Sequence, residues 1–337
     1  MEIFNMMHIE GRDEMKSEVF AIMPGKSEHG TGNGPRWKKL WAQIKLHRFR
    51  YLLLLPGLIF FIIYKYIPMY GIIIAFKKYN FMKGIWKSPW IGLQNFDTLF
   101  RYGDFQRAFI NTIVISVMKI CVIYFFTIIT ALLLNELKDG LFKRGVQTIS
   151  YMPHFLSWVA IYGIFVNILS PESGSFIRLL ISLGLPKIDF FTDPIVFRIT
   201  LVFSELWKSL GWNTIIYLAA LSGIDPELYE AAYMDGANRF RRMLHVSLPG
   251  ILPIIVIMLI LNTGKIMDEN LQQILQFSNP LVTQVSDVFE TIVYRKGIQE
   301  ANYSYATAVG LFKSSVSLIL TLFVNQVAKK AGQEGLW

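Results

Sequence analysis

The sequence is poor in charged residues and in cysteine. Charged residues make up 17% of the 337-residue chain and hydrophobic residues 53%, whereas an average soluble domain carries about a quarter charged residues. This composition excludes a disordered chain and favours a polytopic membrane protein. The single cysteine, Cys121, excludes an intrachain disulfide framework and a CxxC zinc site. The five histidines are scattered without metal-ligand spacing, so we predict no metal site.

A complete phosphate-binding loop is also missing. Gly25-Lys26-Ser27 matches the end of such a loop, but Phe20 stands where its first glycine is required, and no strand precedes it. We therefore predict that this chain binds no nucleotide. The net charge of +9 would suit a nucleic-acid partner in a soluble protein. In a membrane protein, basic residues flank the spans and orient them, so no nucleic-acid partner is predicted.

The first fifty residues differ from the rest of the chain. Residues 1–35 are polar and glycine-containing, which predicts a mobile cytoplasmic tail. Residues 36–50 predict a basic helix that lies on an anionic leaflet, because lysine and arginine occupy the faces beside an apolar stripe. The stripe has helical spacing: Trp37, Leu40, Trp41 and Ile44. A basic flank of the next span would explain much of the same charge.

Long apolar runs fill residues 51–337 and predict an all-α protein with six transmembrane helices. Each run has about the 20 residues that a helix needs to cross hydrocarbon of about 30 Å. The predicted spans are Tyr51–Phe76, Phe109–Leu134, Gln147–Leu169, Phe197–Leu221, Pro249–Met267 and Tyr305–Val327.

Lysine and arginine indicate the orientation of these spans. With the N-terminus inside, the cytoplasmic segments carry more of these residues than the external loops, which favours both termini in the cytoplasm. The first external loop argues the other way through four lysines: Lys77, Lys78, Lys83 and Lys87.

The loop between the fourth and fifth spans, residues 223–250, carries clear helix signals. Asp225 is a good N-cap, Pro226 suits the first helical position, and Glu227 suits the positive end of a helix. These signals predict a helix from Pro226 to about Met234. Beyond it, Gly236 permits a sharp bend before a second short helix rich in arginine.

The first of these helices combines an acidic residue with two small ones. Ala231 and Ala232 follow Glu230, and small side chains let another surface approach the backbone closely. An exposed, compact helical loop of this kind suits the cleft of a partner protein. On this chemistry alone, an ordinary helical hairpin between two spans fits equally well.

The loop resembles the EAA loop of ABC-importer permeases. The family pattern is EAA, three residues, Gly, nine residues, Ile, one residue and Leu-Pro, and only Val246 departs from it, in place of Ile. Asp235 and Ala237, which flank the glycine, are typical of the sugar-importer branch. The positions that match the pattern, together with Asp235, are the predicted ATPase-coupling residues: Glu230, Ala231, Ala232, Asp235, Gly236, Leu248 and Pro249.

Further stretches extend this resemblance over about residues 45–337. They are similar to the maltose-type group of permeases, and within it to the polysaccharide permeases of Gram-positive bacteria. The stretches are YLLLLPGLIFFIIYKYIPMYGIIIAF, YMPHFLSWV, ELWKSLGWNTIIYLAALSGID, NPLV, YSYATAVGLF and the terminal GLW.

The resemblance implies a transport subunit of the cell membrane that has no catalytic site and binds no cofactor. Such a permease pairs with a second permease, in this family often a different chain. The EAA loops dock on two ATPase subunits, which use ATP and Mg²⁺, and an extracytoplasmic binding lipoprotein delivers the oligosaccharide. ATP-driven closure of the ATPases then switches the permeases between inward and outward access.

Charged and aromatic residues within the spans are candidates for the substrate path, because charge at membrane depth is costly. They are Glu205, Trp207, Lys208, Trp212 and Lys313. Glu205 and Lys208 are three residues apart on one helix, and aromatic faces stack on sugar rings. A buried Glu205–Lys208 pair and tryptophan anchors at the membrane interface are the structural alternative. Because Lys119 and Lys265 also lie near membrane depth, a uronate-containing oligosaccharide would be favoured over a neutral one.

Two other functions fit parts of the sequence. An ion-driven secondary transporter would usually show internal repeats and more spans. A membrane-embedded enzyme is conceivable because Asp225, Asp235 and His245 share one loop, but their spacing matches no catalytic motif. The EAA pattern explains this loop better than either alternative.

Overall fold

The computed structural model describes residues 37, 45–101, 103–333, 335 and 336. The predicted tail, residues 1–35, and most of the predicted basic helix, residues 36–50, lie outside the described residues. The described part of the chain is helical, and its only β-pairing is an isolated bridge between Lys77 and Trp90. The chain divides into two compact units, Met1–Pro68 and Met69–Trp337.

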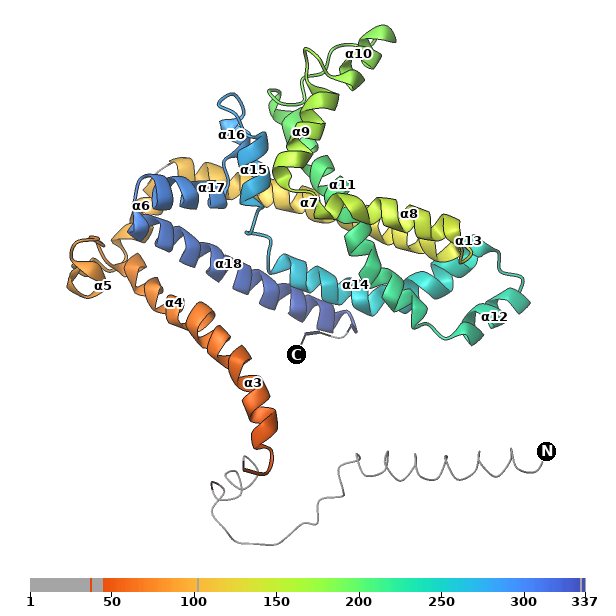
Figure 1. Ribbon diagram of the computed structural model, residues 1–337, viewed down its shortest axis with the longest axis horizontal. Helices are drawn as coiled ribbons and strands as arrows, with labels where there is room; N and C mark the ends of the chain where they lie inside the picture. The colour runs from red at the N-terminus through yellow and green to blue at the C-terminus, as the bar shows by residue number, and fades with distance from the viewer. Residues whose placement is uncertain (1–36, 38–44, 102, 334, 337) are drawn as a thin grey trace, which may run out of the picture. The chain divides into compact units, whose positions relative to one another are not determined.

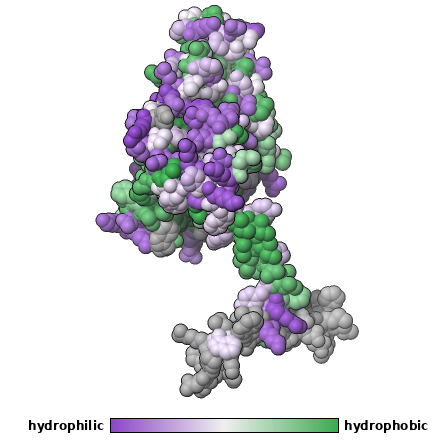
Figure 2. Space-filling model, turned by 90° about the vertical axis from the view of Figure 1, so that its left-hand side faces the viewer, coloured by the Kyte–Doolittle hydropathy of each residue, from purple (hydrophilic) through white to green (hydrophobic). Residues whose placement is uncertain are grey.

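The first unit contains helix α3 (Arg48–Phe61), the π-helical turn η1 (Ile62–Tyr66) and the start of α4 (Ile67–Met69). Beyond Arg48 and Arg50, helix α3 is apolar on all sides, and none of its residues is buried within the chain. Figure 2 shows the side of α3 that faces the viewer as an almost uninterrupted hydrophobic surface. A helix that is hydrophobic all round is typical of a membrane span.

Four long helices build the second unit: α7 (Gly103–Glu136), α11 (Pro194–Ser222), α14 (Leu248–Thr263) and α18 (Tyr303–Lys330). Helix α11 packs along α7 and against α14, which in turn packs against α18 (Figure 1). At 1.5 Å per residue, α7 alone is about 50 Å long, enough to cross a bilayer and extend beyond it.

Shorter helices connect the long ones. They are η2 (Tyr70–Phe76), α5 (Gly84–Lys87), α6 (Gln94–Arg101), α8 (Leu141–Tyr151), η3 (Met152–Phe155), α9 (Trp158–Leu169), α10 (Ser175–Ser182), α12 (Pro226–Met234), α13 (Arg239–Arg242), η4 (Met243–Ser247), α15 (Leu271–Phe277), α16 (Thr283–Ser286), α17 (Phe289–Val293) and η5 (Tyr294–Gln299).

The third predicted span, Gln147–Leu169, is wrong as a single helix. Helices α8 and α9 meet at 108°, so that α8 follows α7 while α9 turns away from it (Figure 1). Leu156 is extended, and the Ser157 hydroxyl then accepts the N–H of Ala160 at 3.2 Å as the N-cap of α9. Pro153, which has no N–H to donate, lies in the 3₁₀ turn before the break.

The number of spans also differs from the prediction. In the described residues, four helical runs are long and apolar enough to cross a membrane, and the bent pair α8–α9 would be a fifth. The fourth predicted span, Phe197–Leu221, lies in α11, which is long enough but carries Arg198, Glu205 and Lys208. The polytopic, all-helical class is confirmed, whereas length and apolarity alone support four or five spans rather than six.

The described core of the second unit consists of three apolar clusters. One joins α6, α7, α17 and α18 around Phe105 and Phe289. A second packs α9, α11 and α15 around Phe165 and Phe277. The third, around Tyr217, holds α7, α11 and α14 together near the loop that contains α12. A polar region remains between these clusters along α7 and α11.

Candidate functional site

The loop that carries the predicted coupling residues has a well-capped first helix. The Asp225 carboxylate accepts the N–H of Glu227 at 3.0 Å, which starts α12 at Pro226 as predicted. Gly236 ends the helix with a φ of +75°, a backbone conformation that L side chains rarely adopt. The N–H of Ala237 then donates to the carbonyl of Ala232 at 3.0 Å and closes the turn.

The second half of the loop folds back on α12. The Asn238 side chain accepts the N–H of Arg241 at 2.9 Å and caps α13, which continues through η4 into α14. The hydroxyls of Tyr229 and Ser247 lie 3.0 Å apart and join the two halves. Ser247 is buried in this contact. Sequence reasoning missed the Tyr229–Ser247 contact because the two residues are 18 positions apart and neither is a fixed position of the EAA pattern.

The loop exposes the predicted coupling residues together with large apolar side chains. Glu230, Ala231, Asp235, Gly236 and Pro249 are exposed, and Ala232 and Leu248 are half-buried. Nearby, Tyr233, Met234 and Phe240 expose 68%, 84% and 63% of their surfaces. Exposed apolar surface beside charged groups is typical of protein–protein contact sites. Figure 1 places α12 and α13 together at one end of the second unit.

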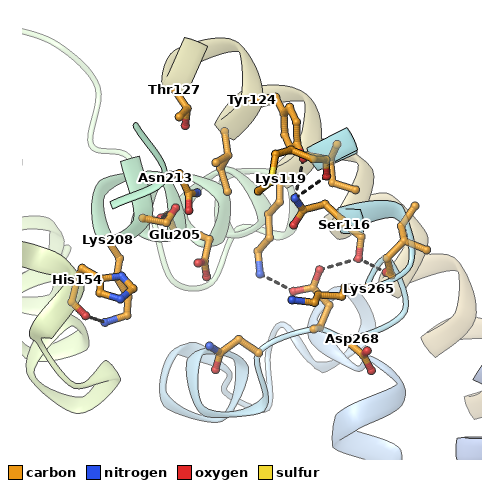
Figure 3. A pocket seen from close by; sticks show the side chains of 18 of the residues that line it. Ser116, Lys119, Tyr124, Thr127, His154, Glu205, Lys208, Asn213, Lys265 and Asp268 are labelled. Carbon is orange, nitrogen blue, oxygen red and sulfur yellow. Dashed lines mark hydrogen bonds and ion pairs between the residues drawn. The ribbon is translucent and has the colours of Figure 1, made fainter. Parts of the chain in front are cut away.

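A cavity of about 640 Å³ lies between α7, α11, α14 and the segment that precedes α15. Its charged lining residues come from all of these elements except α14 (Figure 3). They are Lys119, Glu205, Lys208, Lys265, Asp268 and Glu269. Four of the six were considered from the sequence: Glu205 and Lys208 as path candidates, and Lys119 and Lys265 as lysines near membrane depth. The acidic residues at positions 268 and 269 were not singled out as path residues.

An ion pair fixes one wall of the cavity. The Lys119 ammonium pairs with the Glu269 carboxylate and donates to Oε1 of Gln273 at 2.7 Å. The other Glu269 oxygen accepts the Ser116 hydroxyl at 2.7 Å. Gln273 in turn donates to the hydroxyl of Ser204 on α11 at 2.9 Å. This network ties α7, α11 and α15 together, and its members are buried.

Lys208 binds the break between α8 and α9 rather than Glu205. Its ammonium donates to the carbonyl of His154 at 2.9 Å and to that of Leu156 at 2.5 Å. It also lies 5.4 Å from the ring centroid of Trp158. No ion pair joins Glu205 and Lys208 in the described part of the chain, so the pair suggested by their spacing does not form. The carbonyls freed by the bend attract the ammonium instead.

The other path candidates have different surroundings. Trp207 packs in the apolar cluster around Phe165 and does not line the cavity. Trp212 also lies outside the lining, but its ring stacks on His154, which does line it, with centroids 4.4 Å apart. Glu205 points into the cavity beside the end of Lys119 (Figure 3).

Lys313 does not line this cavity, although its partner Asp268 does. Its ammonium contacts the carboxylates of Asp268 at 2.5 Å and of Glu290 at 2.7 Å, beside a smaller pocket of about 290 Å³. Burial raises the pKa of Glu290, and the hydrogen bond from Lys313 opposes this rise. Two acidic partners account for the charge of Lys313 without a substrate.

Comparison with known proteins covers most of the chain. Residues 123–333 match the family described as binding-protein-dependent transport system inner membrane component. Protein LplB of Bacillus subtilis is 43% identical over 307 residues, which cover 91% of this chain and 96% of that protein. The polygalacturonan/rhamnogalacturonan transport system permease protein YteP of the same organism is 40% identical, with 89% and 94% covered.

A solved structure agrees with these relatives. It is that of a bacterial ABC transporter involved in the import of the acidic polysaccharide alginate, to which this chain is similar with a TM-score of 0.80 and 37% identity. The match covers 87% of this chain and 99% of that one. The chain therefore belongs to the family of binding-protein-dependent transport system inner membrane components and is a permease subunit of an ABC transporter.

Proposed function

We propose that this chain forms half of the membrane pathway of an importer for acidic oligosaccharides. The other half is a second permease, which we expect to be a different chain. Two ATPase subunits bind ATP and Mg²⁺ and drive the cycle, while an extracytoplasmic binding protein delivers the sugar. The observation that carries the coupling part of this proposal is the exposed α12–α13 loop, in which the EAA residues lie beside the exposed side chains of Tyr233 and Met234.

The loop defines the proposed orientation. If α12 and α13 dock on an ATPase, residues 223–250 lie on the cytoplasmic side, and both termini lie there with them. Helix α11 enters the loop only three residues before Asp225, so movement of α12 is transmitted directly to a cavity-lining helix. In the proposed cycle, closure of the ATPases moves α12, and α11 opens or closes the cavity to one side of the membrane.

Lys208 and Lys265 support an acidic substrate, whereas the other two lysines near membrane depth do not. Lys119 and Lys313 are matched by carboxylates and have no charge left for a ligand. Lys208 contacts backbone carbonyls and the Trp158 ring, and Lys265 forms no ion pair within the described residues, so neither of these two cavity-lining ammonium groups has a carboxylate ion-pair partner there. A sugar carboxylate would supply one. The similarity to the alginate importer and to the polygalacturonan/rhamnogalacturonan permease supports the same substrate class.

The coupling role is tested by purification of the complex from detergent-solubilised membranes. We expect an ATPase and a second permease to co-purify with the wild type, and the ATPase to be lost from the variant that combines Glu230→Ala with Gly236→Pro. Proline cannot adopt the φ of +75° at residue 236, so the end of α12 must rearrange.

A matched control separates loss of docking from general damage. Gly184 has a φ of +73° in another exposed loop, and Glu172 is an exposed acid that precedes it in the chain. The Glu172→Ala/Gly184→Pro variant should retain the ATPase. Retention of the ATPase by the Glu230→Ala/Gly236→Pro variant would contradict docking through α12.

The substrate class has its own test. We expect the complete importer to take up a labelled uronate oligosaccharide, and unlabelled uronates to compete at much lower concentration than neutral oligosaccharides of equal length. The physical reason is that a neutral sugar leaves the ammonium groups of Lys208 and Lys265 without an anionic partner. Uptake of neutral oligosaccharides with no response to uronates would refute the acidic-substrate proposal.

A further inference from the structure

The carboxylate of Glu205 is the unmatched acid of the cavity. It makes no hydrogen bond or ion pair within the residues that the structure describes, although it interacts electrostatically with Lys119, Glu269 and Lys208. Both neighbouring ammonium groups are already engaged, Lys119 by Glu269 and Gln273, and Lys208 by two backbone carbonyls. Figure 3 shows the Glu205 carboxylate directed into the open space with no interaction drawn to it.

The carboxyl group of Glu205 offers several acceptor sites in this position. Further polar side chains lie on the same face of α11 as Glu205. Ser209 and Asn213 lie one and two turns further on and also line the cavity, so the three side chains span about 12 Å. The Asn213 amide likewise makes no hydrogen bond in the described chain. This face therefore offers acceptors in a row to a ligand rich in hydroxyl donors.

A basic group without an ion-pair partner lies on a different segment of the cavity wall. Lys265 follows the end of α14, lines the same cavity and is exposed, without an ion-pair partner among the described residues. Among the described residues that line the cavity, the carboxyl group of Glu205 on α11 and the ammonium group of Lys265 after α14 thus have no hydrogen-bond or ion-pair partner. A polymer of plain negative charge would be repelled by Glu205, and a neutral sugar would leave Lys265 unmatched. A uronic acid unit carries both hydroxyl donors and a carboxylate.

Building on the proposed substrate class, we propose that the cavity distinguishes unmodified uronate sugars from their esters. Glu205 accepts hydrogen bonds from free sugar hydroxyls, and Lys265 pairs with the free carboxylate. O-acetylation replaces the hydroxyl donors by acyl oxygen, which leaves the Glu205 carboxylate desolvated and unpaired. Methyl esterification removes the negative charge that Lys265 requires. Glu205 and Lys265 are therefore specificity-determining residues, each for a different modification.

The test measures uptake by the complete importer in membrane vesicles with three matched ligands. These are an unmodified oligogalacturonate, its O-acetylated form and its methyl ester, all of the same length. We expect the wild type to prefer the unmodified sugar over each derivative by about tenfold or more, because loss of a charge-assisted hydrogen bond has an effect of this size.

Two variants then separate the two roles. Glu205→Gln keeps the shape but weakens the acceptor, so it should raise KM for the unmodified sugar and remove most of the discrimination against the acetylated one. Lys265→Met should instead remove the discrimination against the methyl ester. The matched controls Glu172→Gln and Lys138→Met change exposed residues away from the cavity and should alter neither ratio.

The outcomes distinguish this inference from the proposed substrate class. Equal uptake of all three ligands by the wild type would overturn the ester discrimination while leaving acidic-sugar import intact. An equal loss for all three ligands in Glu205→Gln, at normal complex yield, would show a structural role and also overturn it. Uptake of neutral sugars alone would refute the acidic substrate and the inference together.

Discussion

Replacing Glu269 by alanine is expected to destabilise the folded permease by about 3–5 kcal/mol, the cost typical of breaking a buried ion pair. The Lys119 and Glu269 side chains expose 10% and 3% of their surfaces, so each charge is largely shielded from water and depends on its partner. The Ser116 hydroxyl would lose an acceptor in the same step. The loss is measured as a lower melting temperature of the complex in detergent.

Two further variants make this expectation specific. The exposed pair Lys296–Glu300 has a contact of 2.8 Å, and Glu300→Ala should cost less than about 1 kcal/mol because water screens that pair. Combining Lys119→Met with Glu269→Leu removes both charges and should recover part of the stability that Glu269→Ala loses. A Glu269→Ala permease that melts with the wild type would show that the Lys119 charge is satisfied in some other way.

Gly211→Ala is expected to disturb the fold by a different mechanism, steric contact between two backbones. A Cβ at position 211 would lie 2.1 Å from the carbonyl oxygen of Ser150 on α8, far inside van der Waals contact. Because the obstacle is backbone, α8 as a whole must move from α11, at a cost of about 1–3 kcal/mol or more. The shift would also displace the carbonyls of His154 and Leu156 from Lys208, so uptake should fall together with the melting temperature.

Gly145 provides the control for this substitution. It lies in α8 itself, and a Cβ there meets no atom within 4 Å. Gly145→Ala should therefore be neutral or stabilising by up to about 1 kcal/mol, since alanine is the better helix former. Wild-type stability of Gly211→Ala would contradict the close packing of α8 on α11.

Local signals predicted the coupling loop well, because each depends on neighbours in sequence. Asp225, Pro226 and Gly236 specify where α12 begins and ends, and the structure has the helix at Pro226–Met234. The break at Leu156 was missed although Pro153 and the capping residue Ser157 stood in the sequence. The long apolar run was given more weight than these two helix-breaking and helix-capping residues, so a single helix was predicted.

Contacts between distant residues explain what the sequence could not show. The spacing of Glu205 and Lys208 suggested a pair, but Lys208 finds carbonyls more than fifty residues away. Lys119 pairs with Glu269 at a separation of 150 residues. Sequence periodicity relates only residues that are close in the chain, so it cannot reveal such partners. Which charges in the cavity are paired and which are free could be seen only in the folded structure.

The continuity of α11 has a consequence for how this protein can change over evolution. One uninterrupted helix runs from the cavity residue Glu205 to Ser222. In the turn that follows, Ile224 packs closely on Gly250: its Cδ1 lies 2.5 Å from the position that a Cβ on Gly250 would occupy. The cavity residues of α11 and the loop that follows it therefore have a fixed relative orientation about the helix axis. A single inserted residue between them would turn one against the other by about 100°. Substitutions can retune either end independently, whereas length changes in this stretch misalign both at once.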